Sequence, residues 1–257
     1  MLFRSQWFTS IGGSANDFPR SVAIDKSDNI YITGETKSSD FPFKYAGAGT
    51  YIDSTLGGTS DIFLLKFGAD YSHKWGSYFG SSSATEEGHD VCTDPLTAQV
   101  FFTGYCAGGI TMWGSTPYYS QTFGGGSVDG YVLAFTQNIV PVWATYLGYI
   151  GNDVGLTVVA NDWNQLFLSG YTNSSQTGNF LNINPGGGAW FVNTYFAGSG
   201  YDCHISRFTI DPTNTIGISE YNSLIDDLMV YPNPSNGQYN YSFISTEKTV
   251  LDRKSVV

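Results

Sequence analysis

Short runs of alternating apolar and polar residues, separated by polar or glycine-rich turns, dominate this chain. The run Ile30–Thr36 is rich in β-branched and aromatic residues and has Gly34 near its middle, which is typical of a β-strand with crowded side chains. The preceding residues, Asp25–Asn29, are all polar and predict a turn. The only helix-like stretch, Ser223–Asp227, is too short to be stable alone. The pattern predicts an all-β chain.

One set of landmark residues recurs three times with a period of about 68 residues. A tryptophan, two glycines and a phenylalanine mark each copy. The sets are Trp7, Trp75 and Trp143; Gly12, Gly80 and Gly148; Gly34, Gly104 and Gly170; and Phe67, Phe135 and Phe208. An internal repeat of this kind indicates a repeat architecture.

Each copy contains four β-like runs. They are Trp7–Ile11, Ser21–Asp25, Ile30–Thr36 and Asp61–Phe67; then Trp75–Phe79, Asp90–Asp94, Val100–Cys106 and Asp129–Phe135; then Trp143–Leu147, Leu156–Ala160, Leu166–Thr172 and Asp202–Phe208. Four antiparallel strands at a fixed period describe propeller blades better than solenoid units. We therefore predict a β-propeller-like fold of about three four-stranded blades, an incomplete or open arc within residues 1–210. The expected blades are 7–67, 75–135 and 143–208.

The repeats are longer than ordinary propeller repeats because of insertions between the third and fourth runs, at 37–60, 107–128 and 173–201. These insertions are rich in aromatic residues. They hold Phe41, Phe43, Tyr45, Tyr51, Trp113, Tyr118, Tyr119, Phe123, Phe180, Trp190, Phe191, Tyr195 and Phe196. Such rings could stack on sugars or peptides of a ligand, or pack between blades. We favour packing, because the insertions belong to the repeat pattern itself.

The first copy resembles the SBBP-type β-propeller repeat. The matching residues are Trp7, Thr9, Gly12, Gly13, Asn16, Asp17, Ala23–Asp25, Asn29–Gly34, Ser38–Pro42, Gly57, Gly58, Asp61, Phe63, Lys66 and Phe67. The second and third copies are more degenerate but keep the tryptophan, glycine and closing phenylalanine. The resemblance covers residues 7–208. It implies an extracellular or cell-surface propeller and implies no chemistry.

After a linker at 211–227, the tail at 228–257 carries a second resemblance. The run Leu228–Gly237 is similar to the opening of the type A C-terminal sorting domain of the type IX secretion system; an ordinary hairpin is the alternative. The motif residues are Tyr231, Pro232, Asn233, Pro234 and Gly237. The prolines fix an extended segment and Asn-Gly makes a tight turn before Gln238–Phe243. The resemblance implies a Bacteroidota-type protein, with the type IX machinery as partner, that is released or held at the cell surface.

Several features lead us to expect a piece of a larger protein. The family's sorting domain continues for further strands, whereas Thr249–Val257 does not resemble it. Met1–Ser10 lacks the basic start and apolar stretch of a signal peptide. Three blades are also fewer than the four to eight that usually close a propeller, and an open arc would leave sheet edges exposed.

Composition narrows the partners. The formal net charge of −11 disfavours nucleic acid, because an acidic surface repels phosphate. No run of 18 apolar residues occurs, so we expect no membrane-spanning helix. The three cysteines, Cys92, Cys106 and Cys203, cannot all pair within the chain. We expect Cys92 to face Phe101 across a hairpin and all three cysteines to be small buried apolar residues.

Catalytic signatures are mostly absent, and no catalytic, cofactor or metal residues are predicted. His73, His89 and His204 share no ligand spacing and are interpreted as surface or edge histidines. The glycine runs at 124–126 and 186–188 lack a following helix, so we read them as flexible turns and not phosphate cradles.

Acidic residues gather at Glu86, Glu87, Asp90 and Asp94. Paired carboxylates could serve glycoside hydrolysis or bind calcium, but we favour a solvated acidic turn. Calcium is the only cofactor considered, and Asp25, Ser27 and Asn29 have alternate spacing without the shaping glycine of a calcium loop.

These observations favour a secreted or cell-surface propeller, exported by the type IX system, with a non-catalytic binding, adhesion or structural role. Its ligand would be an extracellular glycan or protein. The alternative is an accessory propeller region of a secreted hydrolase or lyase. A purely structural spacer is the third reading.

Overall fold

The computed structural model describes residues 4–82, 84–113, 122–174, 200–210, 229–232 and 239–242. The chain divides into two units, Met1–Ile216 and Gly217–Val257. The first contains β1 (Asp17–Ile24), β2 (Ile30–Thr36), β3 (Asp61–Phe67), β4 (His73–Phe79), β5 (Glu86–Thr93), β6 (Val100–Cys106), β7 (Asp129–Phe135), β8 (Pro141–Leu147), β9 (Asp153–Ala160), β10 (Gln165–Thr172) and β11 (Asp202–Thr209). Across the described ranges there is no helix of the length and apolar character needed to cross a membrane.

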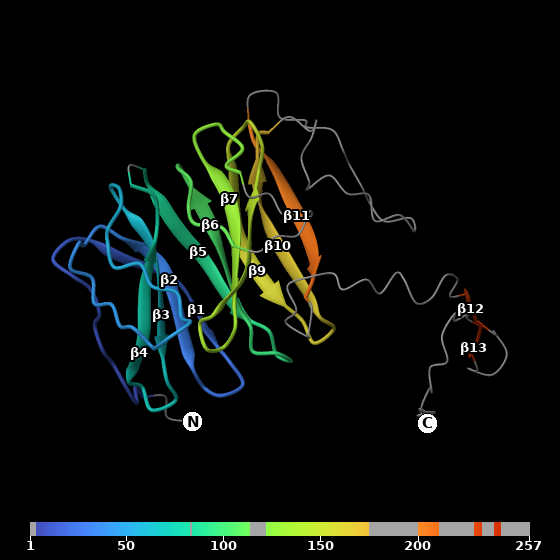
Figure 1. Ribbon diagram of the computed structural model, residues 1–257, viewed down its shortest axis with the longest axis horizontal. Coiled ribbons are helices and arrows are strands. Elements are labelled where there is room, and N and C mark those ends of the chain that lie inside the picture. The colour runs from blue at the N-terminus through green and yellow to red at the C-terminus, as the bar shows by residue number, and fades with distance from the viewer. Residues whose placement is uncertain are drawn as a thin grey trace. The chain divides into compact units, whose positions relative to one another are not determined.

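The strands of the first unit form three antiparallel sheets (Figure 1). The first sheet has the order β1-β2-β3-β4 and the second the order β5-β6-β7-β8. The third sheet, β9-β10-β11, has three strands among the described residues. Each sheet is a simple up-and-down meander, as expected of a propeller blade. The prediction of an all-β fold with open, propeller-like blades is confirmed.

The sheets are offset by one strand from the sequence repeat. The repeat groups Trp75–Phe79 with the strands that follow it, but β4 pairs with β3, the strand before it. The chain reverses within a tight turn in which the Tyr71 amide donates to the Gly68 carbonyl at 2.8 Å. Residues 7–11, the corresponding run of the first copy, form no strand, because no earlier strand among the described residues is available to pair with them.

The first strand of each sheet begins earlier than predicted because it contains a β-bulge. The register shifts between Pro19 and Ser21 in β1 and between Gly88 and Asp90 in β5. In β9 the extra residue is Leu156, because Gly155 and Thr157 pair with consecutive residues of β10. A bulge breaks the apolar–polar alternation on which the sequence prediction of these strands depended.

The core lies between the sheets. One apolar cluster joins the first sheet to the second and includes Tyr31, Leu64, Trp75, Val91, Phe102 and Phe135. Another joins the second sheet to the third and includes Phe101, Val132, Trp143, Val158, Leu166 and Leu168. Each blade therefore buries both faces only where it has a neighbour on both sides.

The described aromatic residues of the insertions mostly pack against the sheets. Phe41 stacks on Phe63 with ring centroids 4.8 Å apart, and Tyr51 stacks on Phe79 at 4.8 Å. Trp113 lies edge-on to Phe135 at 5.1 Å. Tyr45 is the exception and is 56% exposed. Packing is confirmed for most of the described rings, while Tyr118, Tyr119, Phe180, Trp190, Phe191, Tyr195 and Phe196 lie outside the described residues.

The second unit contains a hairpin of β12 (Met229–Pro232) and β13 (Tyr239–Ser242), in which Met229 pairs with Ser242. These strands flank the predicted Asn-Gly turn and form the expected short β tail. Tyr231 and Pro232 of the predicted sorting motif lie in β12. Asn233, Pro234 and Gly237 lie outside the described residues.

The repeated glycine at the centre of each second strand has a common cause. A Cβ at Gly34, Gly104 or Gly170 would lie about 2 Å or less from a backbone carbonyl oxygen of the neighbouring first strand, at 2.0, 1.9 and 1.8 Å respectively. In each case the glycine pairs with the residue beside the bulge. A backbone atom cannot rotate away, so a side chain at this position is incompatible with the bulge.

We predict that Gly104→Ala lowers the free energy of unfolding by about 3 kcal/mol, at the upper end of the cost of overpacking. The added methyl group would force β6 away from the bulge in β5. Gly109→Ala is the control, since its Cβ would meet only the Tyr146 hydroxyl at 3.7 Å, and should change stability by less than about 0.5 kcal/mol. Urea unfolding of both variants measures the difference. Equal stabilities would contradict this role for the glycine.

Candidate functional site

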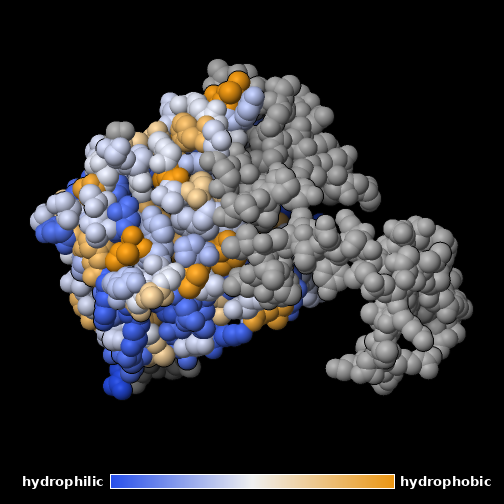
Figure 2. Space-filling model, in the orientation of Figure 1, coloured by the Kyte–Doolittle hydropathy of each residue, from blue (hydrophilic) through white to orange (hydrophobic). Residues whose placement is uncertain are grey.

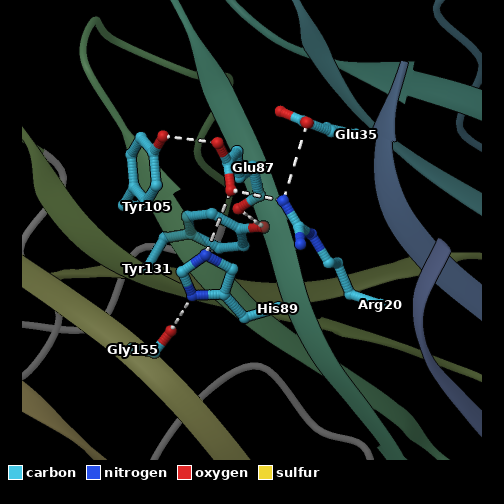
Figure 3. Close-up of polar contacts among 7 residues, drawn as sticks. All are labelled: Arg20, Glu35, Glu87, His89, Tyr105, Tyr131 and Gly155. Carbon is cyan, nitrogen blue, oxygen red and sulfur yellow. Dashed lines mark hydrogen bonds and ion pairs between the residues drawn. The ribbon is translucent and has the colours of Figure 1, made fainter. Parts of the chain in front are cut away.

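A network of charged and polar side chains joins β1 and β5, the first strands of the first and second sheets (Figure 3). The bulges of these strands hold Arg20 and His89 at equivalent positions. A bulge turns its extra residue away from the regular pleat. As a result, each of these side chains reaches the following sheet, where Arg20 meets Glu87 and His89 meets Gly155.

Glu87 lies at the centre of this network. Its Oε2 lies 3.3 Å from Arg20 Nη2 and 3.4 Å from His89 Nε2. The Tyr105 hydroxyl donates to its Oε1 at 2.8 Å. The Tyr131 hydroxyl donates to its backbone carbonyl at 3.2 Å. Every part of Glu87 that can accept a hydrogen bond therefore has a partner within the protein.

Glu35 on β2 forms the second carboxyl of the network, with its Oε1 3.6 Å from Arg20 Nη2. Burial, the charge of Glu87 and a hydrogen bond to Glu87 raise the pKa of Glu35. Burial alone would raise the pKa of Glu87 as well, but hydrogen bonds from Tyr105 and Glu35 and the charge of Arg20 lower it. The two carboxyls therefore differ in acidity, and Glu87 loses its proton at a lower pH than Glu35.

This arrangement resembles an acid–base pair only in its divided pKa values. Catalytic carboxyls of glycosidases stand about 5–10 Å apart with the substrate or a water between them. Glu35 and Glu87 instead both lie within ion-pair distance of the same nitrogen of Arg20. The network therefore connects the first sheet to the second through Arg20.

Asp90 extends the polar connection to all three sheets. The Ser21 hydroxyl on β1 donates to its Oδ1 at 2.5 Å, and the Val158 amide on β9 donates to its Oδ2 at 2.8 Å. Because one carboxylate accepts hydrogen bonds from the sheets on either side, it fixes the spacing of β1, β5 and β9, the first strands of the three sheets.

Glu86 is not part of this network. It is the first residue of β5, and an acidic residue also begins β1 and β9. Asp17 and Asp153 occupy the same position and accept hydrogen bonds from Thr36 and Thr172 respectively. The second copy has Cys106 in place of the threonine, and Glu86 accepts instead from the Ser81 hydroxyl at 2.7 Å. Its other oxygen, Oε2, is buried without a hydrogen-bond partner.

The prediction of a solvated acidic turn is therefore wrong. Glu86, Glu87 and Asp90 lie in strand β5, and Glu86 is fully buried. Asp94 does lie in the following turn, but it is also buried, and its carboxylate accepts from the amides of Leu96 and Thr97. Alternation along β5 sends these carboxylates to different neighbours, so they do not form one cluster.

The groups around Asp25, Ser27 and Asn29 do not suit a calcium site. The Asp25 carboxylate accepts hydrogen bonds from the Ser27 and Asn29 amides, the Tyr31 hydroxyl and the Gln137 side chain. These are donors, whereas calcium needs oxygen ligands. Within the described ranges, no group of three or more His, Cys, Asp or Glu side chains is placed to hold a metal ion.

The other residues singled out in the sequence are dispersed. His73 and His204 lie on β4 and β11, the outer strands of their sheets. Cys92 pairs with Phe101, as predicted. All three cysteines are free, and Cys203 is exposed, which corrects the expectation that it is buried.

The remaining candidates are the glycine runs and one cavity. Gly125 and Gly126 have φ values of 116° and 72°, which confirms a turn at 124–126; residues 186–188 lie outside the described ranges. A cavity of about 390 Å³ has Lys66, Lys74 and Trp75 in its lining and shares no residue with the Glu87 network.

Comparison with known proteins agrees with this architecture. Residues 6–42 match the SBBP beta-propeller repeat. The chain is also similar to an uncharacterized WD repeat-containing protein of Acanthamoeba polyphaga mimivirus, with 27% identity over 193 residues. That match covers 66% of this chain and 13% of the viral protein, so the chain spans a small part of the length of this relative.

We predict that Glu86 makes stability depend on pH. Burial and the charge of Asp61 raise the pKa of Glu86 to about 7, against the hydrogen bond from Ser81. The folded state thus keeps a proton that the unfolded state releases above about pH 4.5, so the free energy of unfolding should fall as pH rises from about 5 to 7. Glu86→Gln should be more stable than the wild type at pH 8 by about 2 kcal/mol.

Urea unfolding between pH 4 and pH 8 measures this effect. Asp28→Asn is the control, because Asp28 is exposed in the β1–β2 turn and its substitution should leave the pH profile unchanged. A Glu86→Gln profile parallel to that of the wild type would contradict the assignment.

Proposed function

We propose that this chain is a non-catalytic propeller protein of the cell surface or the secreted fraction, with a binding, adhesion or structural role. The observation that carries the proposal is the use of Glu35 and Glu87. Both carboxyls form ion pairs with Arg20, so the two residues that most resemble a catalytic pair connect the first sheet to the second. The similarity to a WD repeat-containing protein supports a scaffold role, because such repeats form propellers.

The surface chemistry supports the same conclusion. Most described insertion aromatics are packed against the sheets, and the side of the molecule seen in Figure 2 carries small, separate apolar groups among polar ones. A polar surface of this kind fits contact with a hydrophilic partner, such as an extracellular glycan or protein. Arg20, whose side chain is 44% exposed, is the most accessible charge of the network around Glu87.

Export through the type IX system is part of this proposal. Its support is the Tyr-Pro-Asn-Pro run at 231–234 followed by Gly237, together with the β12–β13 hairpin, whose first strand contains Tyr231 and Pro232. The hairpin alone is compatible with any small β tail, so the support comes mainly from the motif.

A second candidate, the accessory region of a secreted hydrolase or lyase, is favoured only by the divided pKa values of Glu35 and Glu87. Incubation of the purified chain with a panel of polysaccharides and glycoside substrates tests it. We expect no turnover. Turnover lost in Glu87→Gln but kept in the exposed control Asp28→Asn would contradict the non-catalytic assignment.

We predict export that depends on the type IX machinery. The chain, given a periplasmic leader, would be produced in a Bacteroidota host with or without the type IX translocon. It should reach the surface or the medium only when the translocon is present, and Tyr231→Ala with Pro234→Ala should retain it in the periplasm. Immunoblots of the fractions measure this. Equal release from both hosts would contradict the type IX part of the proposal and leave the binding role intact.

A further inference from the structure

A surface cavity of about 390 Å³ lies where the first insertion meets the turn between β7 and β8. Its lining comes from that insertion, from Lys66 on β3, from Lys74 and Trp75 on β4 and from the β7–β8 turn. Every lining residue belongs to the described part of the first two sheets. The volume falls within the range of about 300–1,000 Å³ that is usual for small-molecule sites.

Hydrogen bonds fix the walls of this cavity to both sheets. The Tyr51 amide of the first insertion donates to the Ile139 carbonyl of the β7–β8 turn at 3.2 Å. The Trp75 indole on β4 donates to the Tyr51 carbonyl at 2.8 Å. Trp75 and Ile139 are almost completely buried. Because the walls are held in place before a ligand arrives, binding would cost little ordering entropy.

Two lysine side chains reach the cavity from adjacent strands. Lys66 shares the strand alternation of Leu64, which packs on the second sheet. Lys74 is the extra residue of a bulge in β4, between His73 and Trp75, and a bulge redirects a side chain from the regular pleat. Both lysines line the cavity, so two positive charges face one small space.

The second sheet shows that a blade does not need these lysines. Their equivalents are Ala134 on β7 and Val142 at the matching bulge of β8. These residues are 0% and 6% exposed and pack in the apolar cluster between the second and third sheets. The first sheet therefore carries two charges where packing alone is served by apolar side chains.

Nearby groups leave room for a bound anion. The Lys66 ammonium donates to the Gln137 carbonyl at 2.6 Å, and Lys74 forms an ion pair of 2.9 Å with the exposed Asp70. Burial lowers the pKa of Lys66 against the charge of Asp25, and the charge of Lys74 lowers it further. An ammonium has three donor hydrogens, so each lysine can also bind a ligand oxygen. A negative charge in the cavity would offset the repulsion between the lysines.

We propose that this cavity binds a carboxylate-bearing sugar, a uronate unit, through Lys66 and Lys74. The inference rests on the binding role proposed above and names the class of its ligand. The two ammonium groups would hold the sugar carboxylate by charge-assisted hydrogen bonds. Thr50 and Asn138, which also line the cavity, would serve the ring hydroxyls.

The cavity favours a single sugar unit over other acidic partners. One carboxylate of an acidic protein side chain would leave most of a space of about 390 Å³ unfilled, whereas a ring with hydroxyl groups can contact several walls. The net charge of −11 repels a long polyanion. We therefore expect a free or terminal uronate, and not the interior of an acidic polymer.

Calorimetric titration of the full chain tests the ligand class. Methyl glucuronide should bind saturably, whereas methyl glucoside, which has a hydroxymethyl group in place of the carboxylate, should not. The affinity for the glucuronide should fall as salt is raised, because salt screens the charges. Acetate or N-acetylglutamate that binds as tightly as the glucuronide would overturn the assignment to a sugar.

Variants that carry the second sheet's residues test the site. Lys66→Ala and Lys74→Val should each weaken glucuronide binding at least about tenfold, as expected for lost hydrogen bonds to a charged group. Lys74→Arg should retain binding. Lys37→Gln is the control, because Lys37 is exposed just beyond the opposite end of β2 from Tyr31, the residue that pairs with Lys66. Lys74 is itself exposed, so Lys74→Val tests the site even if Lys66→Ala unfolds.

Two results would overturn this inference. They are the absence of glucuronide binding by the wild type, and equal binding by the wild type and Lys74→Val. Either result would leave a binding role toward another ligand intact. Hydrolysis of the bound glucuronide would instead contradict the non-catalytic role and would still support the site, so the two proposals fail separately.

Discussion

The burial of each sheet face against the next sheet is the constraint on which the rest of this structure depends. No single four-stranded meander can bury both of its apolar faces, so its stability comes from its neighbours. Val91 and Val158 are almost completely buried between sheets, and each such side chain contributes about 1.5–3 kcal/mol. This requirement explains the 68-residue period, because each copy must place apolar residues on both faces of its sheet.

Polar contacts then fix how the faces meet. Bulges in β1 and β5 direct Arg20 and His89 toward the following sheet, and Asp90 accepts hydrogen bonds from the sheets on both sides. Breaking one partner of such a connection leaves a partly buried charge without compensation. The first strands of the three sheets, β1, β5 and β9, are therefore held in a fixed alignment.

Much of the architecture was predictable from the sequence, because the tryptophan and glycine spacings record the blade period directly. The pairing partner of Trp75–Phe79 was not, since a strand's own residues do not say whether it joins the sheet before or after it. The carboxylates from Glu86 to Asp94 were misread because proximity in sequence differs from proximity across a pleated, bulged strand. The network of Arg20 with Glu87 spans 67 residues, and only the equivalence of the bulge positions could have indicated it.

Hydrogen exchange of the backbone amides of β1 and β5 tests this account most directly. These strands are counterparts in the first and second sheets, but Val91 on β5 is 3% exposed and Val22 on β1 is 62% exposed. If burial against the preceding sheet stabilises a strand, the amides of β5 should exchange more slowly than those of β1. Equal exchange in β1 and β5 would contradict the account.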